Sequence, residues 1–141
     1  MKKVFVLLVG FLFLISCEKE GELTRRSLEN VTLSGAATLK YSGSFYPTSG
    51  INASGFAKIY LENNEYKVKL EDIIISDGPD LKVYLSKENT PINFVNLGNF
   101  KGNGNTFYTV PNSVNVSEYH YVLIHCQGFN HLYAIASLTS I

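Results

Sequence analysis

From residue 31 onward, the chain is a succession of short strand-like segments, and this pattern constrains its fold more than any other feature. The segments are rich in Val, Ile, Thr, Tyr and Phe, which favour strands, and are separated by Gly, Asn, Pro and Ser, which favour turns. A loop rich in Ser, Gly and Pro is expected from residue 42 to residue 50. The predicted strands lie at 31–41, 53–62, 65–70, 73–76, 81–86, 94–97, 106–110, 119–126 and 132–138. The sequence therefore predicts an all-β fold, a single antiparallel β-sandwich domain of about eight to ten short strands.

One pair of these segments also predicts its own connection. Apolar and polar residues alternate along 53–62 and again along 65–70, on either side of Asn63-Asn64. Asn tolerates positive φ, which the tight turns of β-hairpins require. We therefore expect a hairpin at this position.

The length and composition of the chain are those of one ordinary globular domain. It has 141 residues, of which 45% are hydrophobic. A domain of this size buries about two-thirds of its unfolded surface without disulfides or metals. The formal net charge is zero, whereas nucleic-acid binding needs Lys and Arg concentrated on one face. The composition therefore predicts no nucleic-acid partner.

The first residues predict export and a lipid anchor. A basic head of two lysines precedes an unbroken apolar run at 4–15, which is shorter than the roughly 20 residues of a membrane-spanning helix but suits a signal peptide. The motif at its end reads Leu14-Ile15-Ser16-Cys17. This motif resembles a bacterial lipobox, in which the Cys sulfur receives a diacylglycerol group and cleavage leaves that Cys as the N-terminus. The alternative is a true membrane helix or an ordinary secretory signal.

These features divide the chain into three parts. We expect a lipoprotein signal peptide at 1–16, a lipid-anchored polar tether at 17–30 and the β-sandwich domain at 31–141. Two or three acyl chains on Cys17, at about 0.8 kcal/mol per buried methylene, would attach the protein stably to a membrane. The predicted location is the bacterial cell envelope, anchored in the outer membrane and facing the periplasm or the surface. Cleavage would leave a mature chain of 141 − 16 = 125 residues.

Lipidation would also leave one free thiol. Cys17 and Cys126 are the only cysteines of the chain, and a thioether at Cys17 removes the only disulfide partner of Cys126. Cys126 ends the segment 119–126, which has the strongest buried-strand pattern. Alternation along a strand places Cys126 on one face and His125 on the other.

Two interpretations of Cys126 follow. Free cysteines are most often small buried hydrophobic residues, whereas a redox thiol or ligand needs solvent access and a cationic neighbour. His131 can supply that neighbour if residues 127–130 form a four-residue hairpin loop, because His131 then lies opposite Cys126. A bulge would shift this register.

Other groupings favour less specialised interpretations. His120, Cys126 and His131 have ligand types suited to a metal, but their spacing matches no known site, so we predict no metal site. The loop 77–80, Asp-Gly-Pro-Asp, could ligate calcium, but a tight turn is the preferred interpretation. A Cys-His nucleophile needs an oxyanion hole and an orienting residue, which the sequence does not indicate. We therefore predict no catalytic residues and no enzyme.

Three clusters of residues, in their order and spacing, resemble a known family. They read Ser76-Asp77-Gly78-Pro79-Asp80-Leu81-Lys82-Val83-Tyr84-Leu85-Ser86, then Leu97-Gly98-Asn99-Phe100-Lys101-Gly102 with Tyr108 and Pro111, then Tyr121-Val122-Leu123-Ile124-His125-Cys126 with Phe129, Tyr133, Ala136 and Leu138. Together they resemble the DM13 domain, also called electron-transfer DM13. The resemblance covers roughly residues 42–138, nearly all of the predicted domain.

The resemblance implies a role in redox chemistry. It implies that the late cysteine, here Cys126, acts as a bare thiol or as a contact for a prosthetic group such as haem. The hairpin register described above makes His131 the candidate neighbour of this cysteine. Gly78, Pro79 and Asp80 form the most specific family motif, as a turn or as a binding element. Covalent haem attachment would need Cys-x-x-Cys-His, which the sequence lacks.

The sequence departs from the family pattern in two places. The residue before the cysteine is usually Trp and is His125 here, and the usual Phe-Gly after it reads Tyr133-Ala134. The missing aromatic shield weakens the haem interpretation and leaves the thiol interpretation open.

The predicted function is therefore a membrane-anchored extracytoplasmic lipoprotein with an accessory electron-transfer role through Cys126. Its expected partners are the membrane, through Cys17, and a separate redox protein. The alternative is a non-redox binding or adhesion module, in which Cys126 is core packing. Solvent access at Cys126 distinguishes the two.

Overall fold

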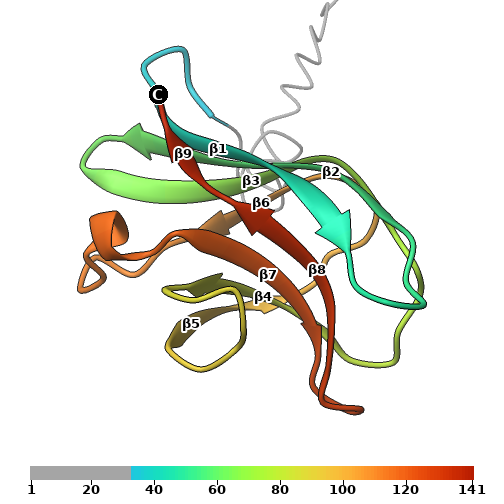
Figure 1. Cartoon of the computed structure of the whole chain (residues 1–141). Coiled ribbons are helices and arrows are strands. Elements are labelled where there is room, and N and C mark those ends of the chain that lie inside the picture. The colour runs from blue at the N-terminus through green and yellow to red at the C-terminus, as the bar shows by residue number, and fades with distance from the viewer. Residues whose placement is uncertain (1–32) are drawn as a thin grey trace, which may run out of the picture. The chain divides into compact units, whose positions relative to one another are not determined.

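The computed structural model describes residues 33–141. Within this range the chain forms nine β-strands and one short 3₁₀-helix, η1 (Figure 1). Their bounds are β1 (Thr38–Pro47), β2 (Ala53–Glu62), β3 (Glu65–Ile75), β4 (Leu81–Ser86), β5 (Phe94–Asn99), β6 (Gly104–Thr109), η1 (Val116–Glu118), β7 (Tyr121–Cys126), β8 (His131–Ser137) and β9 (Thr139–Ser140). The predicted all-β fold is confirmed.

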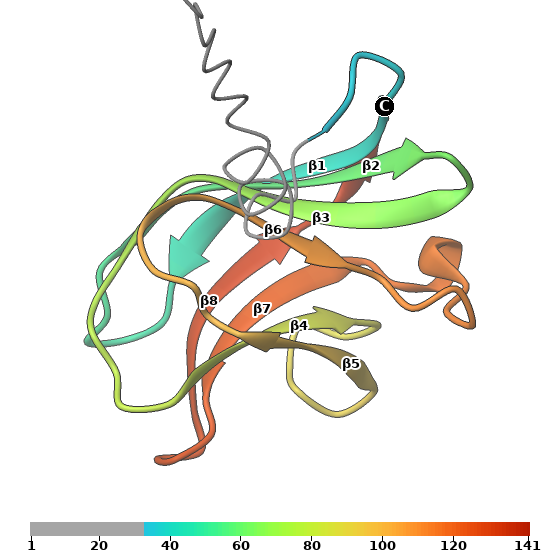
Figure 2. The same ribbon diagram turned by 180° about the vertical axis from the view of Figure 1, so that it is seen from behind.

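The strands form two packed antiparallel sheets that share β1. Their hydrogen-bonded order is β5-β4-β7-β8-β1-β2-β3-β6, with β9 beside β1. The first part of β1 pairs with β2, and its last residues, Phe45 to Pro47, pair with β8. β5 and β6 end the order, and both lie on the same side of the domain (Figure 2). The predicted antiparallel β-sandwich is therefore present, and β1 nearly closes it into a barrel.

The course of β1 shows that the expected loop from residue 42 to residue 50 was wrong. The strand continues through Gly43 to Pro47. A Cβ atom on Gly43 would lie only 2.1 Å from the carbonyl oxygen of Ser137. Glycine therefore allows β1 to pass close to the end of β8, and it does not end the strand.

Both hairpins that the sequence indicated are present. Asn63 and Asn64 join β2 to β3 with φ of 50° and 62°, the positive values that a tight turn between twisted strands requires. Residues 127–130 join β7 to β8, and Cys126 pairs with His131. The pairing predicted between Cys126 and His131 is therefore confirmed. A bulge interrupts the register farther from the turn, between Ile124 and His125.

β3 joins two predicted strands, 65–70 and 73–76, into one element. Asp72 adopts φ of 49°, and the register with β6 shifts between Leu70 and Ile73. Gly55 of β2 lies against this bulge with φ of 118°, and a Cβ atom there would lie 2.8 Å from the Asp72 carbonyl oxygen. The strand thus bends at Asp72 and continues. β9, which pairs with β1 at Tyr41, was not predicted.

β7 buries apolar side chains on both of its faces. Val122, Ile124 and Cys126 belong to the main core between the sheets. Leu123 lies on the opposite face, in a separate cluster with Tyr84 and Ile135. This arrangement agrees with the alternation that the sequence predicted for residues 119–126.

The predicted signal peptide, the tether and Cys17 lie outside the described residues. From Leu33 to Ile141, no helix is long and apolar enough to cross a membrane. The described residues belong to one compact unit, Val31–Ile141.

Candidate functional site

The three sequence clusters meet at one end of the sandwich. The connection from β3 to β4 carries Gly78, Pro79 and Asp80, and the Asp80 carbonyl accepts a 2.9 Å hydrogen bond from the Gln127 amide at the end of β7. The Phe100 amide, which follows β5, donates to the Leu81 carbonyl at 2.8 Å. These two bonds fix the family motif between the β5–β6 connection and the β7–β8 hairpin.

The glycine of the motif lies against two closely packed side chains. A Cβ atom on Gly78 would lie 2.8 Å from Cδ2 of Leu81 and 2.9 Å from the hydroxyl oxygen of Tyr133. That hydroxyl donates to the carbonyl of Asp77 at 3.4 Å. Tyr133, which stands where the family usually has Phe, therefore anchors the loop that holds the motif. These contacts support the structural interpretation of the Gly-Pro turn.

Cys126 is a core residue. Its side chain is 0% exposed and packs in the main cluster, and its cross-strand partner on β4 is Leu81. Within the described part of the chain, the sulfur makes no hydrogen bond, and the free thiol is buried. Its surroundings therefore do not provide the solvent access that a reactive thiol needs.

His131 lies opposite Cys126 in register but is engaged elsewhere. Its Nε2 atom lies 3.5 Å from Oγ1 of Thr48. Its ring meets the ring of Tyr133 edge-on, with 5.3 Å between the centroids. The side chain is exposed, whereas that of Cys126 faces the core. The structure thus pairs the two backbones without joining the two side chains.

His125 occupies the place of the family's usual Trp. It is 5% exposed, and its ring centroid lies 5.6 Å from that of Tyr84. Tyr84 belongs to the separate cluster with Leu123 and Ile135, called here the outer cluster. Its Nδ1 atom has no hydrogen-bond partner among residues 33–141. Burial lowers the pKa of His125 from its ordinary value, since it penalises the charged form. His125 is therefore a largely neutral packing residue at pH 7.

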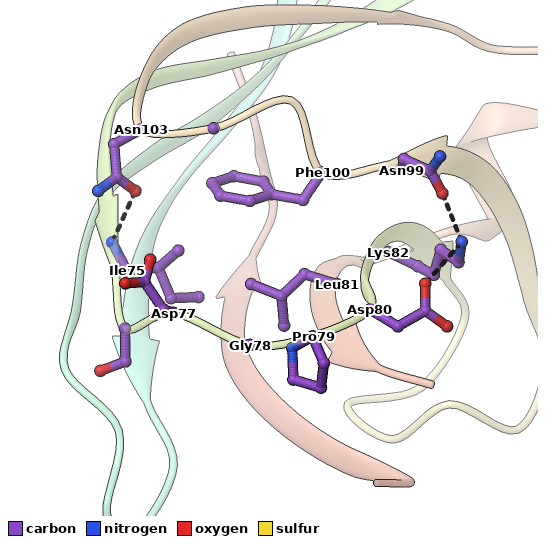
Figure 3. Close-up of a pocket in the computed structure, with 12 residues that line it drawn as sticks. Ile75, Asp77, Gly78, Pro79, Asp80, Leu81, Lys82, Asn99, Phe100 and Asn103 are labelled. Atoms are coloured by element: carbon purple, nitrogen blue, oxygen red, sulfur yellow. Dashed lines mark hydrogen bonds and ion pairs between the residues drawn. The ribbon is translucent and has the colours of Figure 1, made fainter. Parts of the chain in front are cut away.

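A cleft of about 400 Å³ opens beside the family motif (Figure 3). It lies between the β3–β4 connection and the β5–β6 connection. Its lining residues are Ile75, Ser76, Asp77, Gly78, Pro79, Asp80, Leu81, Lys82, Asn99, Phe100, Gly102 and Asn103. Sequence reasoning missed this cleft because it treated the two connections as separate loops. The signal was present in the family resemblance, which groups the residues around Asp80 with those around Phe100.

The polar side chains of the cleft are held in place. Lys82 Nζ lies 2.9 Å from Oδ1 of Asp80 and also donates to Oδ1 of Asn99. The Ile75 amide donates to Oδ1 of Asn103 at 3.1 Å. Asp77 is exposed at the rim (Figure 3). The cleft thus combines fixed hydrogen-bonding groups with the apolar side chains of Leu81 and Phe100.

The residues present do not fit a haem ligated by Cys126. A haem iron needs an axial ligand such as His, Cys, Met or Tyr, and the cleft lining contains none of these. The Cys126 side chain is enclosed by the core and faces no open space. The haem interpretation of the late cysteine therefore finds no site at this position.

The three candidate metal ligands are also separated. His120 precedes β7 and Cys126 ends it, so that the two lie at opposite ends of the strand. In the described range, no three His, Cys, Asp or Glu side chains come together as a metal site would require. Asp77 and Asp80 belong to the cleft lining without a third such residue.

Comparison with known proteins places the domain in a family. No curated protein and no solved structure matches the chain. A family model described as Electron transfer DM13 matches residues 48–138, which include every residue of the candidate site. Because this match spans more than half of the sequence, the chain belongs to the electron transfer DM13 family.

Proposed function

We propose that this chain is an extracytoplasmic lipoprotein whose DM13 domain has an accessory electron-transfer role. The observation that carries the proposal is the family match over residues 48–138, together with the meeting of the family motif and Cys126 at one end of the sandwich. The domain acts beside a separate redox protein and is not itself an enzyme.

Cys126 is the redox residue of this proposal. It is the last residue of β7, and the four residues that follow it, 127–130, are all exposed. Exposed hairpin ends open locally with little loss of buried surface. Opening at this hairpin would uncover the thiol without unfolding the sandwich. The proposal therefore requires Cys126 to be reachable in the native protein.

The complete burial of Cys126 favours a second candidate function. In that case the domain is a non-redox binding or adhesion module, and Cys126 is one of its core side chains. The cleft beside the family motif would then provide the binding function. The two candidates differ in whether native Cys126 reacts.

Thiol labelling separates the two candidates. The full chain with Cys17→Ser, purified from the native host in mild detergent, has Cys126 as its only thiol. We expect a thiol reagent to label Cys126 in native buffer, more slowly than in denaturant but at a measurable rate. A double variant that also carries Cys126→Ala supplies the background. A protein without visible absorption and without labelling before denaturation would contradict the redox role and support the binding module.

The lipid anchor has its own test. We expect wild-type protein to take up labelled fatty acid and to fractionate with membranes, and we expect Cys17→Ser to lose both properties. Cys126→Ser serves as the matched control because it removes the other cysteine. If Cys17→Ser stays in the membrane fraction, the proposed anchor is wrong.

A further inference from the structure

A bulge separates the end of the β7–β8 hairpin from the rest of the ladder. The register shifts between Ile124 and His125, and beyond the shift His125 pairs with Leu132 and Cys126 with His131. The hairpin projects from one end of the sandwich in both views (Figure 1 and Figure 2). Bulges mark places where regular pairing ends, and short strand ends beside an exposed turn open more readily than the middle of a sheet. The strand ends beyond this bulge can therefore open while the other strands stay paired.

A small number of hydrogen bonds ties this hairpin end to neighbouring connections. The Gln127 amide donates to the Asp80 carbonyl at 2.9 Å, and the Thr48 hydroxyl donates to the Leu132 carbonyl. The four turn residues, 127–130, are all exposed. Opening of the hairpin end therefore costs little contact beyond the burial of the two residues that end β7.

His125 is the buried titratable group of this hairpin end. It is 5% exposed, and its Nδ1 atom has no hydrogen-bond partner within 33–141. A protonated imidazole has two N–H donors, so protonation in the closed hairpin would bury both a charge and an unsatisfied donor. Burial lowers the pKa of His125, the side chain of Asn130 opposes this shift, and His131 adds to it. The charged form therefore favours any state in which the ring reaches water.

Among the described residues, the elements packed against His125 give its charge no carboxylate partner. Lys82 is its cross-strand neighbour on β4. The carboxylate of Asp80 is engaged by this lysine, whose Nζ atom lies 2.9 Å from Oδ1. Tyr84 on β4 and Leu132 on β8 contribute an uncharged ring and an aliphatic side chain. Protonation of the closed hairpin would thus place a second positive charge next to Lys82, among apolar neighbours.

The movement that hydrates His125 also uncovers Cys126. The two residues are adjacent at the end of β7, and Cys126 is 0% exposed on the core side of the strand. They share one length of backbone, so separation of the strand ends moves both side chains. We propose that the β7–β8 hairpin is an acid-operated gate, in which protonation of His125 opens the strand ends beyond the bulge and brings the Cys126 thiol to solvent. The gate regulates the proposed redox role and rests on it for its purpose, whereas the opening itself does not depend on electron transfer.

The expected size of the effect follows from proton linkage. In the open hairpin the ring of His125 titrates near its ordinary pKa of 6.5, whereas in the closed hairpin burial keeps it largely neutral. The closed state is therefore favoured above this pH, and the open state gains population as the pH falls below it. Between about pH 7.5 and about pH 5.5 the open fraction should rise up to about tenfold.

Thiol labelling at several pH values measures the gate. Full-length protein carrying Cys17→Ser, in mild detergent, is labelled with 4,4′-dithiodipyridine in native buffer and in denaturant between about pH 7.5 and about pH 5.5. Dividing the native rate by the denatured rate at each pH removes the titration of the thiol itself. We expect this ratio to rise up to about tenfold as the pH falls, and to stay constant in His125→Gln and in His125→Phe. The matched control His120→Gln, at an exposed histidine, should behave as its parent.

Amide hydrogen exchange in the double variant Cys17→Ser/Cys126→Ala measures the same opening without the thiol. Protection of the amides within 125–132 should fall with pH by the same factor, and low concentrations of urea should change it little, because local opening exposes little surface. The gate is overturned if labelling and protection do not change with pH, or if His125→Gln and His120→Gln behave alike. It is also overturned if urea accelerates labelling as steeply as it promotes global unfolding, since the thiol is then reached only by unfolding.

The gate and the redox role fail in different ways. Labelling in native buffer that does not depend on pH contradicts the gate and leaves the redox role standing. Protection that falls with acid, in a protein whose thiol takes no part in electron transfer, contradicts the redox role and leaves the gate standing.

Discussion

At the end of β7, two neighbouring residues experience opposite environments. Cys126 faces the core, whereas His125 faces the outer cluster beside Tyr84. Both side chains are buried, but only His125 carries a group that gains a proton near neutral pH. The residue that replaces the family's usual Trp therefore adds a pH-dependent term to the stability of the domain.

We expect the free energy of unfolding to fall as the pH is lowered from about 7.5 to about 5.5. The pKa of His125 is lowered in the folded state, chiefly by burial. Below its unfolded value of 6.5, the unfolded chain therefore binds a proton that the folded chain does not. Stability is complete above that pH and is lost as the pH falls toward the folded pKa, with a slope of at most about 1.4 kcal/mol per pH unit.

Denaturant unfolding of wild type and His125→Gln over this pH range checks the expectation. The variant should lose most of the slope, whereas His120→Gln, at an exposed histidine, should retain it. Equal slopes in wild type and His125→Gln would show that burial of His125 does not govern the effect.

At the scale of single elements, the β2–β3 turn shows how local chemistry sets a strand register. Asn63 and Asn64 both have positive φ, which most L-residues adopt only at a cost of about 1–2 kcal/mol. The turn fixes Glu62 opposite Glu65, and the ladder continues regularly from there to Phe56 opposite Glu71. A change at the turn should therefore alter stability without altering the core.

Substitution of Asn64 tests the role of the turn. We expect Asn64→Ala to lower the free energy of unfolding by about 1 kcal/mol, and Asn64→Gly to leave it unchanged or to raise it, since Asn-Gly suits this turn. Asn89→Ala, at an exposed position with ordinary φ, should have little effect. Denaturant unfolding measures all three variants, and a loss in Asn64→Gly equal to that in Asn64→Ala would refute the role of positive φ.

The elements that the sequence predicted best are those with local causes. Alternation and the Asn pair predicted β2 to the residue, and a short strand-like segment bounded by turn residues predicted β4 to the residue. The continuation of β1 past Gly43 was missed because its reason lies in the backbone of Ser137, far along the chain. The cleft was missed for the same reason, since its two walls come from separate connections. The family resemblance identified its residues, but only folding shows that they face one another.

At the scale of the whole molecule, β1 is the strand that joins the two sheets. It pairs with β2 and β9 in one sheet and with β8 in the other. Gly43 still pairs with β2, just after the residues that pair with β9 and just before those that pair with β8. The backbone of Ser137 leaves no room there for a Cβ atom. Closure of the sandwich therefore depends on this glycine.

We expect Gly43→Ala to lower the free energy of unfolding by about 2 kcal/mol or more, because an added methyl group must displace backbone atoms. Gly35→Ala is the matched control, since a Cβ atom there meets nothing within 4 Å. Thermal and denaturant unfolding of both variants give the comparison. If Gly43→Ala and Gly35→Ala are equally stable, β1 and β8 can move apart at this point without a loss of stability.

The pairing of Phe45 with Ala136 has a consequence for the order in which the strands can pair during folding. β1, β2 and β3 follow one another closely in the chain and can form a meander early, but the end of β1 has no partner on its other edge until β8 docks. Strand pairings of such long sequence separation form slowly, and unpaired edges promote association between chains. The domain should therefore stay open until β8 pairs with β1, which makes the docking of β8 the step that commits the chain to its native state.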